Sequence, residues 1–213
     1  MMKMIKLKEQ IKAEEYFIRE YDKLPLQVCL FQDNDANCLK LNCLYKDILS
    51  PDDDWKYIIL AACSIVGLLD RNKIKALIHW PHEIYVHERQ IATISVVSLS
   101  SKPGVILTIS LDVNHSEQGI CMKDITHQYY QCSTLVTGLI AFLNIYDNLY
   151  HTQQFYKALD YANDISFFYG KRVKYGSYGV VIFEKLQSNG MLMFRDDKGN
   201  SYQKHILEIE ENK

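Results

Sequence analysis

The distribution of apolar residues changes character near residue 168, and this change constrains the fold more than any other feature of the chain. Up to about residue 165, segments with a helical spacing of apolar side chains alternate with segments that have the pattern of strands. From residue 168 onward the chain consists of short apolar segments separated by turn sequences such as Asn189-Gly190. We therefore predict an α+β unit over residues 1–165 and a small antiparallel β-barrel over residues 168–213.

The same patterns predict individual elements. The spacing of Met4, Leu7 and Ile11 favours one amphipathic helix over residues 3–23, which Pro25 ends. Further helices are predicted over residues 55–69, 133–150 and 152–163. Strands are predicted over residues 26–31, 38–45, 74–79, 90–99, 104–113, 178–186, 191–194 and 202–209.

Composition excludes several classes of function. The chain has 213 residues and a net charge of −2, so it offers no extended basic surface, and we expect no nucleic-acid partner. The longest apolar run, Tyr57–Leu69, is too short to span a bilayer, and the N-terminal segment has no secretory apolar core, so we expect no membrane association. Six cysteines without a CxxC motif indicate reduced core thiols in a cytoplasmic protein rather than a zinc site.

Four segments and the tail resemble one family. The segment IHWPHEIYVHERQIATI at residues 78–94 resembles the central motif of biotin protein ligases, K-W-P-N-D-I-Y, a short turn, and K-[IL]-[AC]-G-I-L. DANCLKL at 35–41 is similar to the family's G-x-N-L-x-x-S, VILTISLDVN at 105–114 to I-G-I-G-L-N-V-N, and MKDIT at 122–126 to S-L-K-x-I-T-G. The tail is similar in layout to the family's SH3-like C-terminal domain, so the resemblance covers about residues 26–213.

The resemblance implies a fold and a reaction. Members of the biotin/lipoate-protein ligase family have an α+β domain with a mixed sheet and flanking helices, followed by the SH3-like β-barrel. They use ATP and magnesium to convert biotin to an acyl-adenylate, which a lysine of an acceptor protein then attacks. The resemblance therefore implies ATP, biotin and Mg as cofactors only if this chain is active. It also implies a biotin carrier-like domain, or a second copy in a homodimer formed by sheet extension, as the possible protein partner.

The sequence departs from the family where adenylation takes place. Gln90 stands at the position of the family's catalytic lysine, and Arg89 is expected on the opposite face of the strand because neighbouring strand residues alternate. The family's Gly/Arg-rich loop is missing after the strand that ends at Gln32. The chain continues directly to Asp33 and on to Asn37, and its aspartates would repel a phosphate.

The positions that correspond to the family's biotin pocket carry larger, polar side chains. Thr93, Thr108 and Ser110 stand at family glycines, and Asp112 stands at an asparagine. Larger side chains in a packed pocket cost about 1–3 kcal/mol each. Thr108, Ser110 and Asp112 alternate along one strand and share a face, which favours water or a small polar or cationic ligand over biotin. The alternative is that Thr108 and Ser110 bond across strands and nothing binds.

The turn within the central motif leaves two interpretations open. Trp80-Pro81 is kept and fits either a structural corner or a ligand contact, while His82 and Glu83 replace the family's Asn and Asp. A metal site built from His79, His82, His87 and Glu83 is the minor alternative, because their spacing is irregular; we predict no metal. The expected ligand-contacting positions are Gln32, Asn37, Trp80, His82, Glu83, Thr93, Thr108, Ser110 and Asp112, with Gln90 and Arg89 as degenerate catalytic positions.

Three functions are compatible with this pattern. The favoured one is a ligase-like binding or interaction protein that has lost adenylation, because the positions that carry chemistry are the ones that changed. The second is an active biotin ligase of a carboxylase carrier protein with a divergent site. The third is a sensor of a small carboxylate or nucleotide on the same scaffold.

Overall fold

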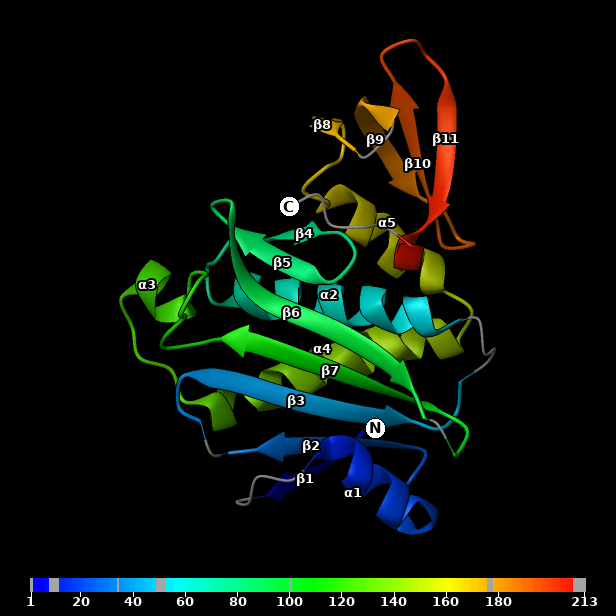
Figure 1. The fold of residues 1–213 in the computed structure, drawn as a ribbon. Coiled ribbons are helices and arrows are strands. Elements are labelled where there is room, and N and C mark those ends of the chain that lie inside the picture. Colours follow the sequence, from blue (N-terminus) through cyan, green and yellow to red (C-terminus); the bar gives the residue numbers. More distant parts are fainter. Residues whose placement is uncertain are drawn as a thin grey trace.

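The fold consists of one large mixed sheet with helices, followed by a small antiparallel sheet (Figure 1). It is known from a computed structural model that describes residues 2–7, 12–33, 35–48, 53–99, 101–175 and 178–208. The large sheet has seven strands and the small sheet four. The predicted α+β class is confirmed, as is the mixed sheet that the resemblance implies.

The large sheet has the strand order β1-β2-β3-β7-β6-β5-β4. Its strands are β1 (Lys3–Leu7), β2 (Gln27–Gln32), β3 (Cys38–Tyr45), β4 (Leu77–His79), β5 (Glu83–Val86), β6 (Arg89–Ser98) and β7 (Val105–Asp112). β1 runs parallel to β2, and the other described pairs are antiparallel. β3, β7 and β6 form the centre of the sheet.

Two long helices, α2 (Asp54–Arg71) and α4 (Cys132–His151), cover one face of the sheet (Figure 1). α2 is apolar on nearly all sides because it lies between the sheet and the helices α4 and α5 (Phe155–Asp164). None of the described helices has the length and apolar character needed to cross a membrane.

The other face of the sheet is covered at one end only. α1 (Ala13–Glu20) places Phe17 against Val28 and Leu30 of β2, and this small cluster is separate from the main core. In Figure 1, α1 lies over the end of the sheet that contains β1 and β2, while β6 and β7 face the viewer. The central strands therefore present an uncovered surface.

The prediction of one helix over residues 3–23 is wrong. Residues 3–7 form β1, paired in parallel with β2 from Lys3 opposite Val28 to Leu7 opposite Gln32, and the helix begins at Ala13. Ile5 and Leu7 pack against the cluster under α1, so the apolar residues that satisfy a helical period here serve a strand. Ile11 lies outside the described residues.

The other predicted elements are present, the strand over 38–45 with the predicted bounds and the rest with shifted ends. The predicted strand over 74–79 begins at Leu77, and the predicted helix over 152–163 begins at Phe155. β5 and the short helix α3 (Met122–Thr126) were not predicted. The last predicted strand ends at His205, where a single 3-10 turn (Ile206–Glu208) follows, and residue 209 lies outside the described residues.

The small sheet is antiparallel with the strand order β11-β10-β9-β8. Its strands are β8 (Arg172–Lys174), β9 (Val180–Leu186), β10 (Met191–Asp196) and β11 (Ser201–His205). Phe183 and Phe194 have ring centroids 5.7 Å apart, and Tyr175 packs edge-on against both. An aromatic cluster thus packs against this small sheet, and it is continuous with the main core.

All six cysteines are free, and five of them are buried. Burial raises the pKa of the Cys38 thiol to about 11, and the neighbouring Asp112 carboxylate adds to this shift. The prediction of unpaired core thiols thus holds for five of the six, and Cys38 is half-buried.

The end of α2 holds a lysine in a left-handed backbone conformation. Lys73 has φ 63°, its N–H bonds to the carbonyl of Asp70 at 2.8 Å, and the N–H of Ile74 bonds to Leu69 at 2.9 Å. These bonds define a Schellman motif, in which glycine is the preferred residue. We expect Lys73→Gly to raise the free energy of unfolding by about 0.5–1 kcal/mol in urea denaturation. Lys73→Ala keeps the Cβ and should give no such gain; an equal gain from alanine would contradict the explanation.

Candidate functional site

Polar side chains cover the central part of the sheet face that α1 leaves uncovered. Thr93 on β6 lies opposite Ser110 on β7, which lies opposite Lys40 on β3. Their sequence neighbours Ile94 and Ile109 are buried in the main core on the other side. We call this surface the open face; its described side chains are Lys40, Asn42, Glu83, Gln90, Thr93, Ser95, Thr108, Ser110 and Asp112.

The open face is accessible to solvent at its centre. The Thr93 side chain is exposed and Ser110 is half-buried. The Thr108 hydroxyl donates to Oδ1 of the buried Asn42 at 2.9 Å. Thr108 therefore bonds across strands, which is the Thr108 part of the alternative without a ligand, while Thr93 remains open to water or a ligand.

Gln90 is held on the open face by a bulge and by a carboxylate. Ile84 lies opposite Ala92 but Tyr85 lies opposite Gln90, so Ile91 is an extra residue on β6. Because of this bulge, Gln90 shares a face with Thr93, three residues away. Gln90 Nε2 donates to Glu83 Oε1 at 2.6 Å. An uncharged amide, bound to an anion, occupies the position where the resemblance implies a catalytic lysine.

Glu83 is an ionised, well-partnered carboxylate. Its second oxygen, Oε2, lies 3.3 Å from His79 Nδ1, and His79 stacks on Tyr85 with ring centroids 4.4 Å apart. The pKa of Glu83 is lowered, chiefly by the hydrogen bond with His79 and also by one with Tyr85, while burial acts in the opposite direction. Glu83 and its partners thus place a fixed negative charge beside Gln90.

The lowered pKa of Glu83 predicts a pH-dependent contribution to stability. A carboxyl whose pKa falls on folding stabilises the protein above its unfolded-state pKa, and this contribution is lost as the pH falls through the folded-state pKa. We expect Glu83→Gln to lower the free energy of unfolding by about 1–2 kcal/mol at pH 7. The difference from wild type should shrink below about pH 4.5, as measured by urea denaturation across pH. A difference that grows as the pH falls would contradict this assignment.

Asp112 is a half-buried carboxylate at the end of β7. Burial raises its pKa, and the Ser116 hydroxyl, which donates to Oδ2 at 2.6 Å, opposes this shift. Asp112 pairs with Cys38 in the sheet, so it lies at the end of the open face where β3 begins. It supplies a second negative charge to this surface.

Arg89 is engaged away from the open face. It lies opposite Val86, a core residue, and its guanidinium donates to the carbonyl of Gly119. The N–H of Ile120 bonds to the carbonyl of Gln90 at 2.9 Å, and a Cβ on Gly119 would approach that carbonyl oxygen to 2.2 Å. The loop from residue 113 to 121 therefore packs against β6 through a glycine and uses Arg89 as an anchor.

Gln32 and Asn37 lie at the end of the sheet where Asp112 is also found. Gln32 ends β2 and is buried, whereas Asn37 is exposed and its carbonyl accepts the N–H groups of Val113 and Asn114 at 2.8 and 3.0 Å. Asp33, between them, pairs with Lys6 at 2.5 Å. Asn34 lies outside the described residues.

The surroundings of Trp80 and His82 differ from those of the residues on the open face. Trp80 is 3% exposed within the main core, and its indole N–H donates to Ser166 Oγ at 2.8 Å. The carbonyl of His82 accepts the N–H of Ile94 at 2.7 Å. The environment of Trp80 fits the structural-corner interpretation.

In the described part of the chain, no three or more His, Cys, Asp or Glu side chains are grouped so as to hold a metal ion.

The charge of the open face is slightly negative. Lys40 is the one cation among its described side chains, and Glu83 and Asp112 are the anions. Lys40 and Asn42 were absent from the predicted site, although the alternation of residues 38–45 already places both on one side. Such a surface suits a neutral polar or cationic group better than a polyphosphate.

The chain resembles biotin protein ligases in fold. The apo structure of biotin protein ligase from Aquifex aeolicus gives a TM-score of 0.82 at 17% identity, over 98% of this chain and 97% of that chain. Biotin acetyl coenzyme A carboxylase synthetase from Helicobacter pylori gives 0.60 at 12% identity, over 96% and 100%. A biotin protein ligase-like protein of unknown function from Silicibacter sp. TM1040 gives 0.79 at 6% identity, over 97% and 94%.

Sequence comparison adds nothing to this likeness, because no protein-family model and no curated protein matches the chain. At such low identities the solved structures establish the fold alone. The chain has the biotin protein ligase fold along nearly its full length.

Proposed function

We propose that this protein is a binding protein built on the biotin protein ligase fold and that it does not form acyl-adenylates. The observation that carries the proposal is the Gln90–Glu83 hydrogen bond of 2.6 Å. It puts a neutral amide where a ligase would need a cation, and the adjacent carboxylate would also compete for any cation placed there.

The charges of the open face support this proposal. Adenylation joins a carboxylate to a nucleotide triphosphate, so positive groups must neutralise charge that develops in the transition state. Arg89 is directed to the Gly119 carbonyl, and Lys40 lies two strands away from Gln90. Asp35 lies close enough to Asp112, at the end of this surface, to raise the pKa of that carboxyl.

We infer that a ligand of the open face is small and either polar or cationic. Thr93 and Ser110 offer hydroxyl groups, and Asp112 offers a carboxylate. They do not form the flat apolar floor that biotin's ring system requires, because Thr93 and Ser110 carry side chains where a glycine would leave the backbone bare. Thr93, which is exposed, would meet the ligand first.

Calorimetry with biotin and with ATP tests the proposal. We expect no saturable heat from biotin with the wild-type protein, and no ATP heat that depends on the residues of the open face. A Thr93→Gly, Thr108→Gly, Ser110→Gly variant should gain biotin affinity, while Ser98→Gly, further along β6, should not. Micromolar binding of biotin by the wild type would overturn the proposed ligand class.

The alternative function is an active biotin ligase that modifies a carrier-protein lysine, with ATP and Mg. The likeness in fold to two named ligase structures favours it. It requires Arg89 or a histidine to replace the catalytic lysine.

A sensor of a small carboxylate or nucleotide would use the same open face, and it would show binding of the acid or nucleotide without turnover.

We further propose that residues 168–213 form an SH3-like barrel domain separate from residues 1–165 in a cytoplasmic protein. The antiparallel order β11-β10-β9-β8 and the aromatic cluster around Phe194 support a small β unit, although its buried residues are continuous with the main core. A carrier-like protein domain or a second copy of the chain is the proposed protein partner. Size-exclusion chromatography with light scattering distinguishes a monomer from a dimer.

A further inference from the structure

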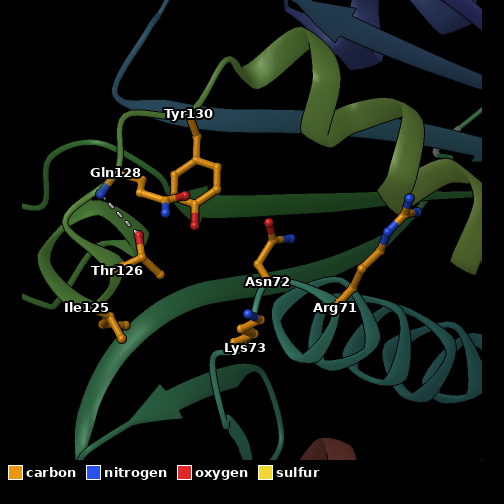
Figure 2. Close-up of a pocket in the computed structure, with 7 residues that line it drawn as sticks. All are labelled: Arg71, Asn72, Lys73, Ile125, Thr126, Gln128 and Tyr130. Atoms are coloured by element: carbon orange, nitrogen blue, oxygen red, sulfur yellow. Dashed lines mark hydrogen bonds between the residues drawn. The ribbon is translucent and has the colours of Figure 1, made fainter.

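A polar pocket lies at the C-terminal end of α2, the helix that covers the sheet face opposite the open face. The pocket measures about 440 Å³ and is formed by the end of α2, by α3 and by the segment that follows α3 (Figure 2). Its lining residues are Arg71, Asn72, Lys73, Ile125, Thr126, Gln128 and Tyr130. It shares no residue with the open face.

The pocket carries two cations and no anion. Arg71 and Lys73 have no ion pair with any described residue, and neither Asp nor Glu is among the lining residues. Asp70, the acid nearest in sequence, pairs with Lys75 at 2.5 Å. A positive potential therefore remains for a ligand to neutralise.

Hydrogen bonds within and behind its walls hold the pocket in place. Asn72 Nδ2 donates to the Leu68 carbonyl at 2.8 Å, and the backbone N–H of Gln128 donates to the Thr126 hydroxyl at 3.3 Å. The backbone of Tyr130 bonds at both its N–H and its carbonyl to Asn114, at 2.9 and 2.8 Å. The walls are thus preorganised, which lowers the entropic cost of binding.

The positions of the side chains leave donors available to a ligand. In Figure 2 the Tyr130 hydroxyl points from one wall toward Asn72 on the other, with the Gln128 amide beside it. Arg71 also lines a neighbouring pocket of about 590 Å³ at the start of α4, and in Figure 2 its side chain extends away from Gln128 and Tyr130. Arg71, Lys73, Gln128 and Tyr130 can all donate hydrogen bonds to an anionic ligand.

We propose that this pocket binds a phosphate monoester. A monoester carries a charge of about −1.5 to −2 at neutral pH, which the two unpaired cations match. The guanidinium fork suits two phosphate oxygens and the ammonium a third. The pocket is larger than a phosphate group, and the Tyr130 ring and the Ile125 side chain provide an apolar wall for the organic part. This site does not depend on the function proposed for the open face.

Binding titrations followed by amide chemical shifts test the proposal, with inorganic phosphate and AMP as separate probes. Both should saturate, and AMP should bind more tightly because its nucleoside fills the remaining space. Arg71→Gln should weaken binding of each probe by about tenfold, since it removes a charge-assisted donor. Lys73→Gly should weaken binding several-fold without lowering the melting temperature, because glycine suits the φ of 63°.

Lys157→Gln is the matched control. It removes the same charge from an exposed residue of α5. The affinity should stay within about twofold of wild type, because α5 begins against Trp55 at the start of α2 and the 18-residue helix puts the pocket about 25 Å away, beyond a Debye length. No saturation up to millimolar phosphate, or an equal loss in the control, would overturn the site. Phosphate binding without AMP binding would overturn the monoester. AMP binding that is lost in the Thr93→Gly, Thr108→Gly, Ser110→Gly variant but kept in Arg71→Gln would mean that AMP binds the open face. That outcome would overturn the pocket as the AMP site and would contradict the ligand class proposed for the open face.

Discussion

Biotin-dependent exchange of pyrophosphate into ATP is expected to run at least about 10⁴-fold slower in this protein than in an ordinary biotin protein ligase. Removing one group that stabilises transition-state charge costs about 10²–10³ in rate. Here Gln90 replaces a cation, Glu83 holds its amide at 2.6 Å, and no Gly/Arg-rich sequence follows Gln32. Several contributions are therefore missing together.

A variant of Gln90 and a reference ligase are measured in the same exchange assay. Gln90→Lys should form an ion pair with Glu83 and should leave the exchange rate at background, because a cation held by a carboxylate is not available to a nucleotide. An authentic ligase under the same conditions gives the reference rate. Turnover within tenfold of that reference would contradict loss of adenylation, and Arg89→Gln would then show whether Arg89 has taken over the role.

Elements with long or strictly alternating patterns were predictable from the sequence. The strand at residues 38–45 was predicted with the observed bounds, and the helix predicted over 55–69 is α2 with a few more residues at its ends. In both, local pattern and tertiary environment agree: alternate β3 residues enter the core, and α2 is apolar on nearly all sides because it is enclosed.

Elements that depend on distant partners were not predictable. Met4 and Leu7 satisfy a helical period, but residues 3–7 gain hydrogen bonds by pairing with β2, which no local pattern encodes. β5 was missed because the turn after it uses His87 and Glu88, with φ 49° and 62°. Turns with two positive φ values usually carry Asn or Gly, and that signal is absent here.

The candidate site was predictable as a face but not as a set of contacts. Alternation places Thr108, Ser110 and Asp112 together, and the structure has them on one surface. The bulge at Ile91 changes which β6 residues share that surface, and the hydrogen bonds of Gln90 and Thr108 depend on strand register. Register arises from the whole sheet, so single-strand patterns do not contain it.

The structural and ligand-contact interpretations of Trp80 predict very different effects of truncating its side chain on the free energy of unfolding. We expect Trp80→Ala to lower the free energy of unfolding by about 3–5 kcal/mol, the usual cost of truncating a buried aromatic side chain. Trp80 is 3% exposed, and its indole N–H bonds at 2.8 Å to Ser166, which itself pairs with Ile78 where the chain passes toward the small sheet. Circular dichroism during urea denaturation measures the change without relying on tryptophan fluorescence.

Two milder variants separate packing from hydrogen bonding at this corner. Trp80→Phe keeps most of the buried ring and should lose about 1–2 kcal/mol, and Ser166→Ala, which removes only the acceptor, should lose a similar amount. If Trp80 instead contacted a ligand, its truncation would leave stability within about 1 kcal/mol of wild type and would alter binding at the open face. Because the ring is enclosed by the core, the large loss of stability with little change in ligand affinity is the expected result.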